Sequence, residues 1–230
     1  MTEVWYAAYG SNLLAARFRC YMEGGVAPGA DGPSAAGARD PSPPTDERAT
    51  FLPWRLGFVY RSSSWQQGGV AVIGGEATGD EQTLGRLWRL TVEQFEDVVR
   101  QENDDQQLCV DLDRLLVQGS DDIGSGAYGR LLYGGERDGL PIVTCTGLRF
   151  PPEETAAPPS LPYLRCLIAG LRETFNLNKQ GVKRYLRRLP GIADGGVSTE
   201  LLGKAFTQAE ELLAADEDED EDEDNADERN

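Results

Sequence analysis

The pattern of side chains changes abruptly near the N-terminus. Residues 4–9, VWYAAY, are rich in β-branched and aromatic side chains, which is typical of a strand. Residues 13–18, LLAARF, are strong helix formers, and Ser11 or Asn12 stands where it would cap a helix. Gly10 lies between the two segments and permits a sharp turn. Such a turn directs unpaired backbone N–H groups at one place, which suits an anion or a developing oxyanion, although an ordinary β–α turn has the same pattern.

Apolar periodicity predicts the remaining elements. Strands are expected over residues 52–61, 69–73, 84–90, 128–133 and 140–148, the last two joined by the hairpin signal GGERDG. Helices with one apolar face are expected near residues 161–171, 179–189 and 201–213. Strands of hairpin type with helices inserted among them and after them indicate an α+β domain.

The stretch TVEQFEDVVRQEN predicts a helix that ends in a candidate catalytic residue. Thr91 and Gln94 have the spacing of a capping box. The residues that share one face of this helix are Val92, Phe95, Val99 and Glu102. A carboxylate on an apolar face is uncommon and is suited to general acid–base catalysis. The alternative is a helix that ends at this point and turns Glu102 into water.

The composition narrows the chemistry that this chain can carry out. The 230 residues include no histidine, which excludes Ser-His-Asp and Cys-His nucleophile systems and zinc sites built on histidine. Acid–base chemistry then falls to Asp, Glu, Tyr, Lys or Cys. The four cysteines, Cys20, Cys109, Cys145 and Cys166, are scattered, which indicates reduced thiols in a cytoplasmic protein rather than a disulfide framework or a zinc site.

The net charge of −17 is concentrated at the C-terminus, where residues 216–230 hold 11 acidic residues and one arginine. Such a segment repels itself and has little apolar surface to bury, so we predict a disordered acidic tail over residues 216–230. Its role is either solubility or the binding of a basic partner. Residues 1–215 are expected to form a single domain, in which the Gly- and Pro-rich residues 24–49 make a flexible loop.

Three other features bear on partners. No apolar run approaches the ~20 residues of a membrane span, so no membrane partner is expected. The sequence GSGAYG at residues 124–129 matches G-x-G-x-x-G, but a strand-like segment follows it, so we interpret it as a turn and expect no dinucleotide cofactor. The basic residues 179–188 are interpreted as a solvated helix face, because an acidic chain lacks the positive field that binding to nucleic acid needs.

Six segments resemble, in order, the motifs of the γ-glutamylcyclotransferase-like superfamily. YAAYGSNLL resembles the Y-G-S-N-L signature of that family, and QEN at residues 101–103 resembles the segment that carries its catalytic glutamate. The other segments are WQQGGVAVI, GRLWRL, SGAY and PSLPY. The resemblance implies a mixed β-barrel flanked by helices, and an enzyme that cyclises a γ-glutamyl amide to 5-oxoproline and releases an amine, without a metal or a cofactor.

The resemblance also implies roles for individual residues. Glu102 would be the general acid–base. The turn of Gly10, Ser11, Asn12 and Leu13 would hold the substrate α-carboxylate or the tetrahedral oxyanion. Tyr9, Tyr128 and Tyr163 would form the wall of the pocket and supply hydrogen bonds.

Two departures from the family pattern leave the substrate open. Asn103 stands where the family usually has glycine, and about two dozen residues separate it from Tyr128. The loop at residues 24–49 is also long. One alternative is therefore the removal of a γ-glutamyl group from a biosynthetic amine, and another is a non-catalytic protein that interacts through its acidic tail. The leaving amine and the oligomeric state cannot be derived from the sequence.

Overall fold

The computed structural model describes residues 2–26, 35–77, 79–152, 154–193 and 195–227. Its main sheet has six strands in the order β2-β5-β1-β8-β7-β6. These strands are β1 (Glu3–Ala8), β2 (Glu47–Leu52), β5 (Thr83–Thr91), β6 (Ser120–Asp122), β7 (Arg130–Arg137) and β8 (Leu140–Thr146). The sheet is mixed, because β1 and β8 run parallel whereas the other neighbours are antiparallel. The fold is α+β, as predicted.

Strands β3 (Trp54–Ser62) and β4 (Gly68–Glu76) form a separate two-stranded sheet, so the described residues contain no closed barrel such as the one that we predicted. The edges of this hairpin are bonded to other parts of the chain. On β3, Phe58 N–H donates to Pro190 O, and Phe58 O accepts from Ala157 N–H. On β4, the Thr146 hydroxyl bonds both main-chain groups of Ile73. Because these edge groups are already satisfied, the hairpin does not extend the main sheet.

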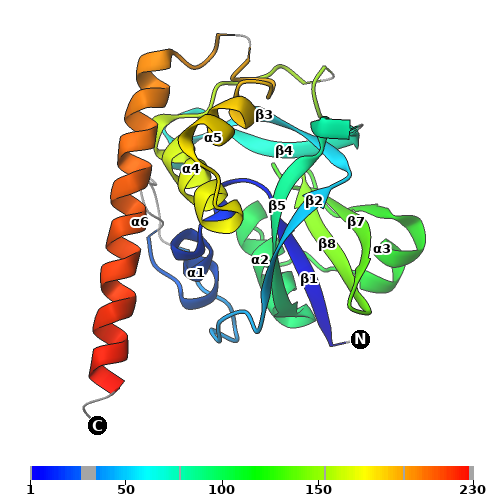
Figure 1. Ribbon diagram of the computed structural model, residues 1–230. Coiled ribbons are helices and arrows are strands. Elements are labelled where there is room, and N and C mark those ends of the chain that lie inside the picture. The colour runs from blue at the N-terminus through cyan, green and yellow to red at the C-terminus, as the bar shows by residue number, and fades with distance from the viewer. Residues whose placement is uncertain (1, 27–34, 78, 153, 194, 228–230) are drawn as a thin grey trace.

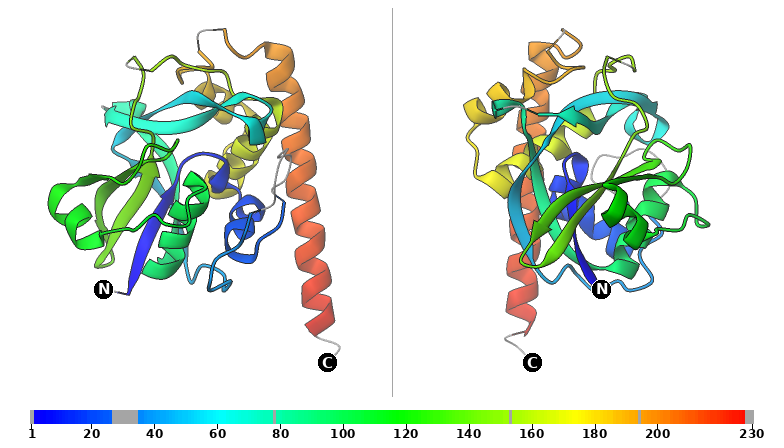
Figure 2. Two further views of the ribbon diagram at one scale, coloured as in Figure 1. Left: turned by 180° about the vertical axis from the view of Figure 1, so that it is seen from behind. Right: turned by 90° about the vertical axis from the view of Figure 1, so that its right-hand side faces the viewer.

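Helices cover both faces of the sheet (Figures 1 and 2). They are α1 (Ala15–Glu23), α2 (Val92–Asn103), α3 (Leu112–Gln118), α4 (Leu161–Phe175), α5 (Lys179–Leu186) and α6 (Thr199–Asp227). Short 3₁₀ turns occur at η1 (Ser11–Leu13), η2 (Ser63–Trp65) and η3 (Gly79–Glu81). No helix in the described part of the chain has both the length and the apolar character needed to cross a membrane.

The two hydrophobic cores follow from the alternation of side chains along β1. Val4, Tyr6 and Ala8 pack into a core with α1 and α2. Trp5 and Ala7 point the other way, into a core with the hairpin and α4–α6. Successive side chains of a strand face opposite sides of its sheet, so β1 lies between two cores. Its C-terminal end, where Gly10 follows, is therefore fixed from both sides.

The beginning of α1 differs from the prediction. We expected Ser11 or Asn12 to cap a helix that starts near residue 13. The chain instead forms η1, and α1 then starts after Leu14 with no side-chain cap. The Asn12 side chain is directed at Tyr6 and Glu102, so it is not available to cap the helix.

Helix α2 begins with the predicted capping box, in which Thr91 and Gln94 exchange hydrogen bonds. The segment after it, where the sequence analysis predicted no helix or strand, contains α3 and β6. Residues 27–34 of the predicted loop lie outside the described residues. The part that follows is attached to α2, since Arg39 binds Asp97.

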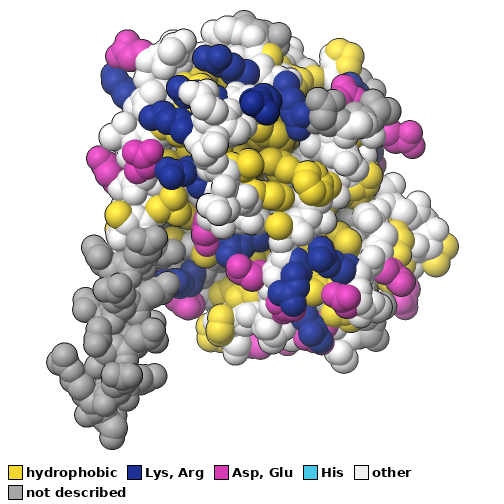
Figure 3. Space-filling model, in the orientation of Figure 1, with side chains coloured by type: hydrophobic (Ala, Val, Ile, Leu, Met, Phe, Trp, Pro, Cys, Tyr) yellow, Lys and Arg dark blue, Asp and Glu magenta, His cyan; other side chains and the backbone are white. Residues whose placement is uncertain are grey.

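At the C-terminus, α6 continues to Asp227, although the sequence predicted disorder from residue 216. Extending a helix that already exists costs less than starting one, which favours this continuation. The boundary between domain and tail stays a prediction. Basic side chains gather on the face around α5 (Figure 3). Two of them pack on α6, where Lys179 and Lys183 lie over the ring of Phe206 at 5.2 and 5.6 Å.

Candidate active site

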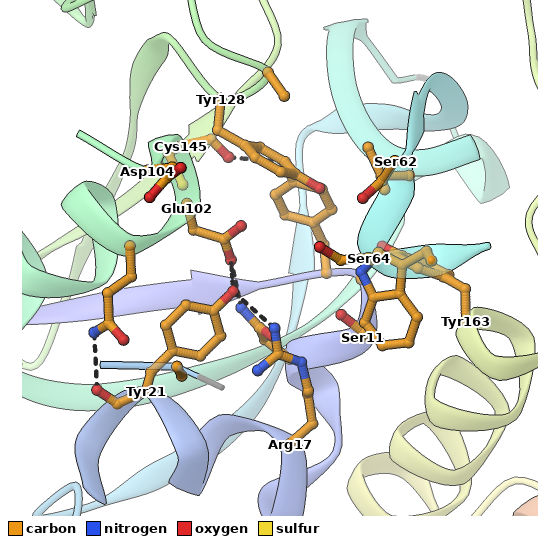
Figure 4. Close-up of a pocket in the computed structure, with 18 of the residues that line it drawn as sticks. Ser11, Arg17, Tyr21, Ser62, Ser64, Glu102, Asp104, Tyr128, Cys145 and Tyr163 are labelled. Carbon is orange, nitrogen blue, oxygen red and sulfur yellow. Dashed lines mark hydrogen bonds between the residues drawn. The ribbon is translucent and has the colours of Figure 1, made fainter. Parts of the chain in front are cut away.

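A cavity of about 400 Å³ lies where η1, the end of α2, the β3–β4 hairpin and the start of α4 come together (Figure 4). Seven of the eight predicted site residues line it: Tyr9, Gly10, Ser11, Asn12, Glu102, Tyr128 and Tyr163. Its other lining side chains include Tyr6, Arg17, Tyr21, Ser62, Ser64, Trp65, Gln101, Asp104, Gln106 and Cys145. Segments far apart in the sequence thus form one hollow.

Glu102 is a half-buried residue on the last turn of α2 and is held by two donors. Asn12 Nδ2 lies 2.8 Å from Glu102 Oε1, and the Tyr21 hydroxyl donates to the same oxygen at 2.7 Å. Both bonds end on Oε1, so neither of them uses Oε2. The Glu102 side chain is therefore fixed against η1 and does not turn freely into water.

Asn12 is buried and fixed on both its main chain and its side chain. Trp88 Nε1 donates to Asn12 O at 3.1 Å, and Asn12 Nδ2 bonds Glu102. Asn12 Oδ1 is also buried, and none of the described residues donates a hydrogen bond to it. A buried acceptor without a donor is costly, so this oxygen is suited to accept a hydrogen bond from a bound ligand.

Two pocket tyrosines bind the main chain of one residue of β4. Ala71 N–H donates to the Tyr163 hydroxyl at 3.1 Å, and the Tyr128 hydroxyl donates to Ala71 O at 3.0 Å. Tyr163 uses its oxygen as an acceptor in this contact, whereas Tyr128 uses its proton. Burial raises the pKa of Tyr163 to about 12 and that of Tyr128 well above its usual value, so both hydroxyls stay protonated at neutral pH.

The glycine of the turn permits the close approach of Tyr163. A Cβ atom on Gly10 would lie 2.5 Å from the Tyr163 hydroxyl oxygen and 3.1 Å from Ala71 Cβ. Any other residue at this position would therefore displace the tyrosine or the hairpin. The sequence predicted a turn at Gly10, and the structure adds this steric reason.

Leu13 is the one predicted site residue that does not line the cavity. Its side chain is buried, and its N–H donates to Gly10 O at 3.1 Å. The N–H of Leu14 is likewise used within the turn, by Ser11 O. Of the predicted anion cradle, Gly10, Ser11 and Asn12 line the cavity and Leu13 does not. That the three residues bind an anion stays a prediction.

The turn is supported by an ion pair between the buried Arg86 and the half-buried Glu173. Arg86 of β5 donates to Leu13 O at 2.9 Å and to Glu173 Oε1 of α4 at 2.7 Å. Glu173 Oε2 accepts from Ala15 N–H at 3.2 Å. Carbonyl and N–H groups on either side of Leu14 are thus held by one Arg–Glu pair, which fixes the direction in which η1 leaves the sheet.

Arg17 and Tyr21 of α1 also line the cavity, although the sequence did not predict them as site residues. Arg17 Nη2 donates to the Tyr21 hydroxyl at 3.0 Å, and its guanidinium carbon lies 4.5 Å from the centroid of the Tyr21 ring. Among the described residues, Arg17 forms no ion pair with a carboxylate, and its Nε is buried without a partner. The sequence did contain a signal for this pair, because Arg17 and Tyr21 are four positions apart and therefore lie on one face of the helix that follows the turn.

The remaining chemistry of the lining is limited. Burial raises the pKa of the Cys145 thiol well above its usual value, which disfavours the thiolate form that a nucleophilic cysteine needs. Burial likewise raises the pKa of Tyr6 and Tyr9 well above the usual value, and Tyr9 donates its hydroxyl to Cys145 O at 2.7 Å. Within the described ranges, no three Cys, Asp or Glu side chains are placed so that they could hold a metal ion.

The solved structures that are similar to this chain include the following two. One is described as "Gamma-glutamyl cyclotransferase"; it is 20% identical, with a TM-score of 0.47 over 89% of this chain and 99% of that chain. The other is a crystal structure of an uncharacterized protein from Homo sapiens, 19% identical, with a TM-score of 0.44 over 88% of this chain and 98% of that chain.

Among curated proteins, the chain is similar to "Histone deacetylase 5" of Arabidopsis thaliana. The two are 35% identical over an alignment of 200 residues, and the alignment covers 80% of this chain. The chain spans 30% of the length of that relative. No protein-family model matches the chain.

Proposed function

We propose that this chain is a γ-glutamylcyclotransferase-like enzyme, which cyclises a γ-glutamyl amide to 5-oxoproline and releases a free amine. One observation carries the proposal: Glu102 is fixed by Asn12 and Tyr21 on the wall of a cavity that also contains the Gly10 turn. The deacetylase name describes a longer protein, of which this chain matches 30%, and plays no part in the proposal.

The polar groups of the cavity suit the two charged ends of a glutamyl group. The α-amino group would donate to Glu102 and to the unpaired Asn12 Oδ1. The α-carboxylate would lie between the Gly10 turn and Arg17, since both line the cavity and the Arg17 guanidinium bonds the Tyr21 hydroxyl and forms no ion pair among the described residues. Holding both ends places the α-nitrogen near the γ-carbonyl carbon of the same molecule, which gives the large rate gain of an intramolecular reaction.

The proposed reaction moves two protons from the α-nitrogen to the leaving nitrogen and needs no redox step. Glu102 takes a proton from the α-ammonium, and the freed lone pair attacks the γ-carbonyl carbon to form the new C–N bond of the five-membered ring. Glu102 returns the proton to the leaving nitrogen as the tetrahedral intermediate collapses and the original amide C–N bond breaks. It then takes the second proton from the ring nitrogen, which becomes the neutral lactam N–H, and passes it to the released amine, which departs as an ammonium ion. Tyr163 is the preferred donor to the oxyanion, because its oxygen accepts from Ala71 N–H and its own proton is not used in that bond.

A second candidate concerns the leaving group. Asp104 and Gln106 belong to the segment inserted after Glu102, and both line the cavity. An acidic side chain there favours an amine that carries an additional positive charge, as in the deprotection of a γ-glutamylated amine. The same catalytic groups serve both candidates, and only the amine differs.

The test is release of 5-oxoproline from a panel of γ-glutamyl amino acids and γ-glutamyl amines. We expect turnover of at least one class, and a loss of about 10³-fold in kcat for Glu102→Gln, the scale of general acid–base catalysis. Glu96→Gln is the matched control, since Glu96 lies on the same helix and pairs with Arg100 instead of lining the cavity. Retained turnover in a folded Glu102→Gln variant would overturn the assignment. Inactivity of the wild type on the whole panel would favour the non-catalytic alternative.

A further inference from the structure

Asn103, next to the proposed general acid–base, binds the main chain of Tyr128 on both sides. Asn103 Nδ2 donates to Tyr128 O at 3.2 Å, and Tyr128 N–H donates to Asn103 Oδ1 at 3.3 Å. Asn103 Nδ2 also donates to Val99 O at 3.0 Å, which fixes the side chain on the last turn of α2. A side-chain amide thus pairs with one residue as a neighbouring strand would.

This pair of hydrogen bonds joins the two ends of a long inserted segment, residues 104–127. Residues 104–127 leave the end of α2, form α3 and β6, and return to the cavity at Tyr128. Bringing the ends of so long a segment together has an entropic cost, and without a local tie the returning residue would be less well ordered. The Asn103 amide supplies that tie, since it directly precedes the inserted segment and binds the residue that directly follows it.

Gly126 is matched to the same contact. A Cβ atom on Gly126 would lie 2.4 Å from Asn103 Oδ1, closer than the two atoms can approach. The Gly126 φ angle is outside the left-handed region, so alanine is compatible with the backbone there. The glycine therefore makes room for the Asn103 side chain and is not required by the conformation of the turn.

We propose that Asn103 is a positioning residue that holds Tyr128 at the cavity wall beside Glu102, a task that arises from the inserted segment. The inference rests on the proposed function. Glycine, which usually follows the glutamate in the family that the motifs resemble, has no side chain that could make these bonds. Asn103 thus holds the main chain of Tyr128, whereas the side chain of Tyr128 is held at its hydroxyl, which donates to Ala71 O.

Amide hydrogen exchange at Tyr128 tests the tie without reference to activity. In Asn103→Ala we expect exchange of the Tyr128 amide to be about tenfold faster, because its acceptor is lost and the local segment opens more easily. Asn178→Ala is the matched control; that asparagine accepts from Gly181 N–H at 2.9 Å in α5 and should leave Tyr128 unchanged. Unchanged exchange in Asn103→Ala would overturn the proposal.

A double-mutant cycle with Gly126→Ala tests the same contact from the other side. Alone, Gly126→Ala should accelerate exchange at Tyr128, because its Cβ pushes the amide of Asn103 away. In the Asn103→Ala background the same substitution should add little, since the clashing atom is gone. Additive effects of the two substitutions would contradict a shared contact.

The kinetic readout separates positioning from chemistry. With γ-glutamyl-alanine as substrate, Asn103→Ala should raise KM about five- to tenfold and change kcat less, because Tyr128 forms the wall and not the proton path. Asn103→Asp keeps the acceptor for Tyr128 N–H, so its KM should lie between that of the wild type and that of Asn103→Ala. Unaltered kinetics together with faster exchange would overturn the positioning role. A wild type inactive on all γ-glutamyl amides would instead overturn the proposed function, and the exchange data would still decide whether the tie exists.

Discussion

Asn12 and Glu102 are 90 positions apart in the sequence, yet Asn12 Nδ2 lies 2.8 Å from Glu102 Oε1. The first residue belongs to the turn after β1, and the second to the last turn of α2. The main chain of Asn12 is itself held by Trp88 of β5, so the sheet determines where the carboxylate of Glu102 lies. The hydrogen bond therefore connects the proposed anion cradle to the proposed general acid–base.

Replacing Asn12 by alanine should mainly weaken substrate binding. The variant loses the donor to Glu102 and the unpaired acceptor Oδ1 proposed for the substrate amine. We expect KM to rise about tenfold, the value of one hydrogen bond to a charged group, with a smaller fall in kcat. Steady-state kinetics of 5-oxoproline release measures both constants. A fall in kcat at constant KM would mean that Asn12 acts in the transition state instead.

The close approach of Gly10 and Tyr163 makes a prediction about stability. Gly10→Ala should destabilise the fold by about 1–3 kcal/mol, as overpacking does, because the new Cβ would lie 2.5 Å from the Tyr163 hydroxyl oxygen. Adding Tyr163→Phe removes that oxygen and leaves the ring carbon Cζ at 3.6 Å, so it should restore part of the stability. Chemical denaturation of the two variants measures the difference.

The control is a glycine with open space around it. A Cβ atom on Gly203 of α6 would meet no atom within 4 Å, so Gly203→Ala should stabilise the protein by up to about 1 kcal/mol through helix propensity. Equal effects of the alanine substitutions at Gly10 and Gly203 would show that the steric argument at the turn is wrong.

Arg17 is the third test, because its proposed partner is the substrate. The guanidinium contacts Tyr21 but no carboxylate of the described residues. Arg17→Gln should raise KM about tenfold, since a charge-assisted hydrogen bond to the substrate α-carboxylate is lost. Arg19→Gln, two positions along α1 and absent from the lining of the cavity, is the control.

A substrate analogue identifies the carboxylate that Arg17 binds. If the substrate α-carboxylate is converted to a carboxamide, the wild type and Arg17→Gln should have similar KM values, because the group that Arg17 binds is gone. If the advantage disappears only when the leaving group lacks its carboxylate, Arg17 binds the other end of the substrate.

The parts of the site that were predicted from the sequence are those fixed by local patterns. The strand before Gly10 and the apolar stripe that ends in Glu102 both follow from periodicity, and they locate the two halves of the cavity. The family resemblance then implied that these two segments belong to the same site. Tyr21 was missed because the predicted helix segment ended at residue 18, although the helical period continues to Tyr21. Arg17 lay inside that segment, but its partner four positions further on did not, so the pair was not recognised.

Other features depend on contacts that no local pattern encodes. The sequence predicted one barrel, but the structure has two separate sheets. They stay separate because Thr146 and main-chain groups near Pro158 and Pro190 bond to the edges of the β3–β4 hairpin. Strand β6 has only three residues and pairs with β7 at the margin of the sheet, too short a stretch for alternation to be visible. Likewise, Leu13 was placed in the cradle from its position in the motif, but its N–H is used inside the turn.

The attachment of the loop after α1 to α2 predicts a pH dependence of stability. Asp97 is buried on α2 and accepts from Arg39 N–H and Arg39 Nε, each at 2.9 Å, and from Arg100 Nη1 at 3.1 Å. Burial alone would raise the pKa of Asp97, but the hydrogen bonds from Arg39 and Arg100 outweigh it, so the pKa is lowered. A carboxyl group with a lowered pKa in the folded state stabilises the fold above its unfolded value of about 3.9, and this contribution disappears as the pH falls through the folded value.

Asp97→Asn should therefore lower the denaturation midpoint at pH 7, and the gap from the wild type should shrink as the pH falls below about 4. Urea unfolding at pH 7 and pH 3 measures the gap. Asp113→Asn, at an exposed position of α3, removes the same charge and should change the midpoint little at either pH. A gap for Asp97→Asn that is as large at pH 3 as at pH 7 would mean that the carboxylate charge is not what holds the loop. The shape of the asparagine side chain would then account for the loss, and the loop would be attached by neutral hydrogen bonds.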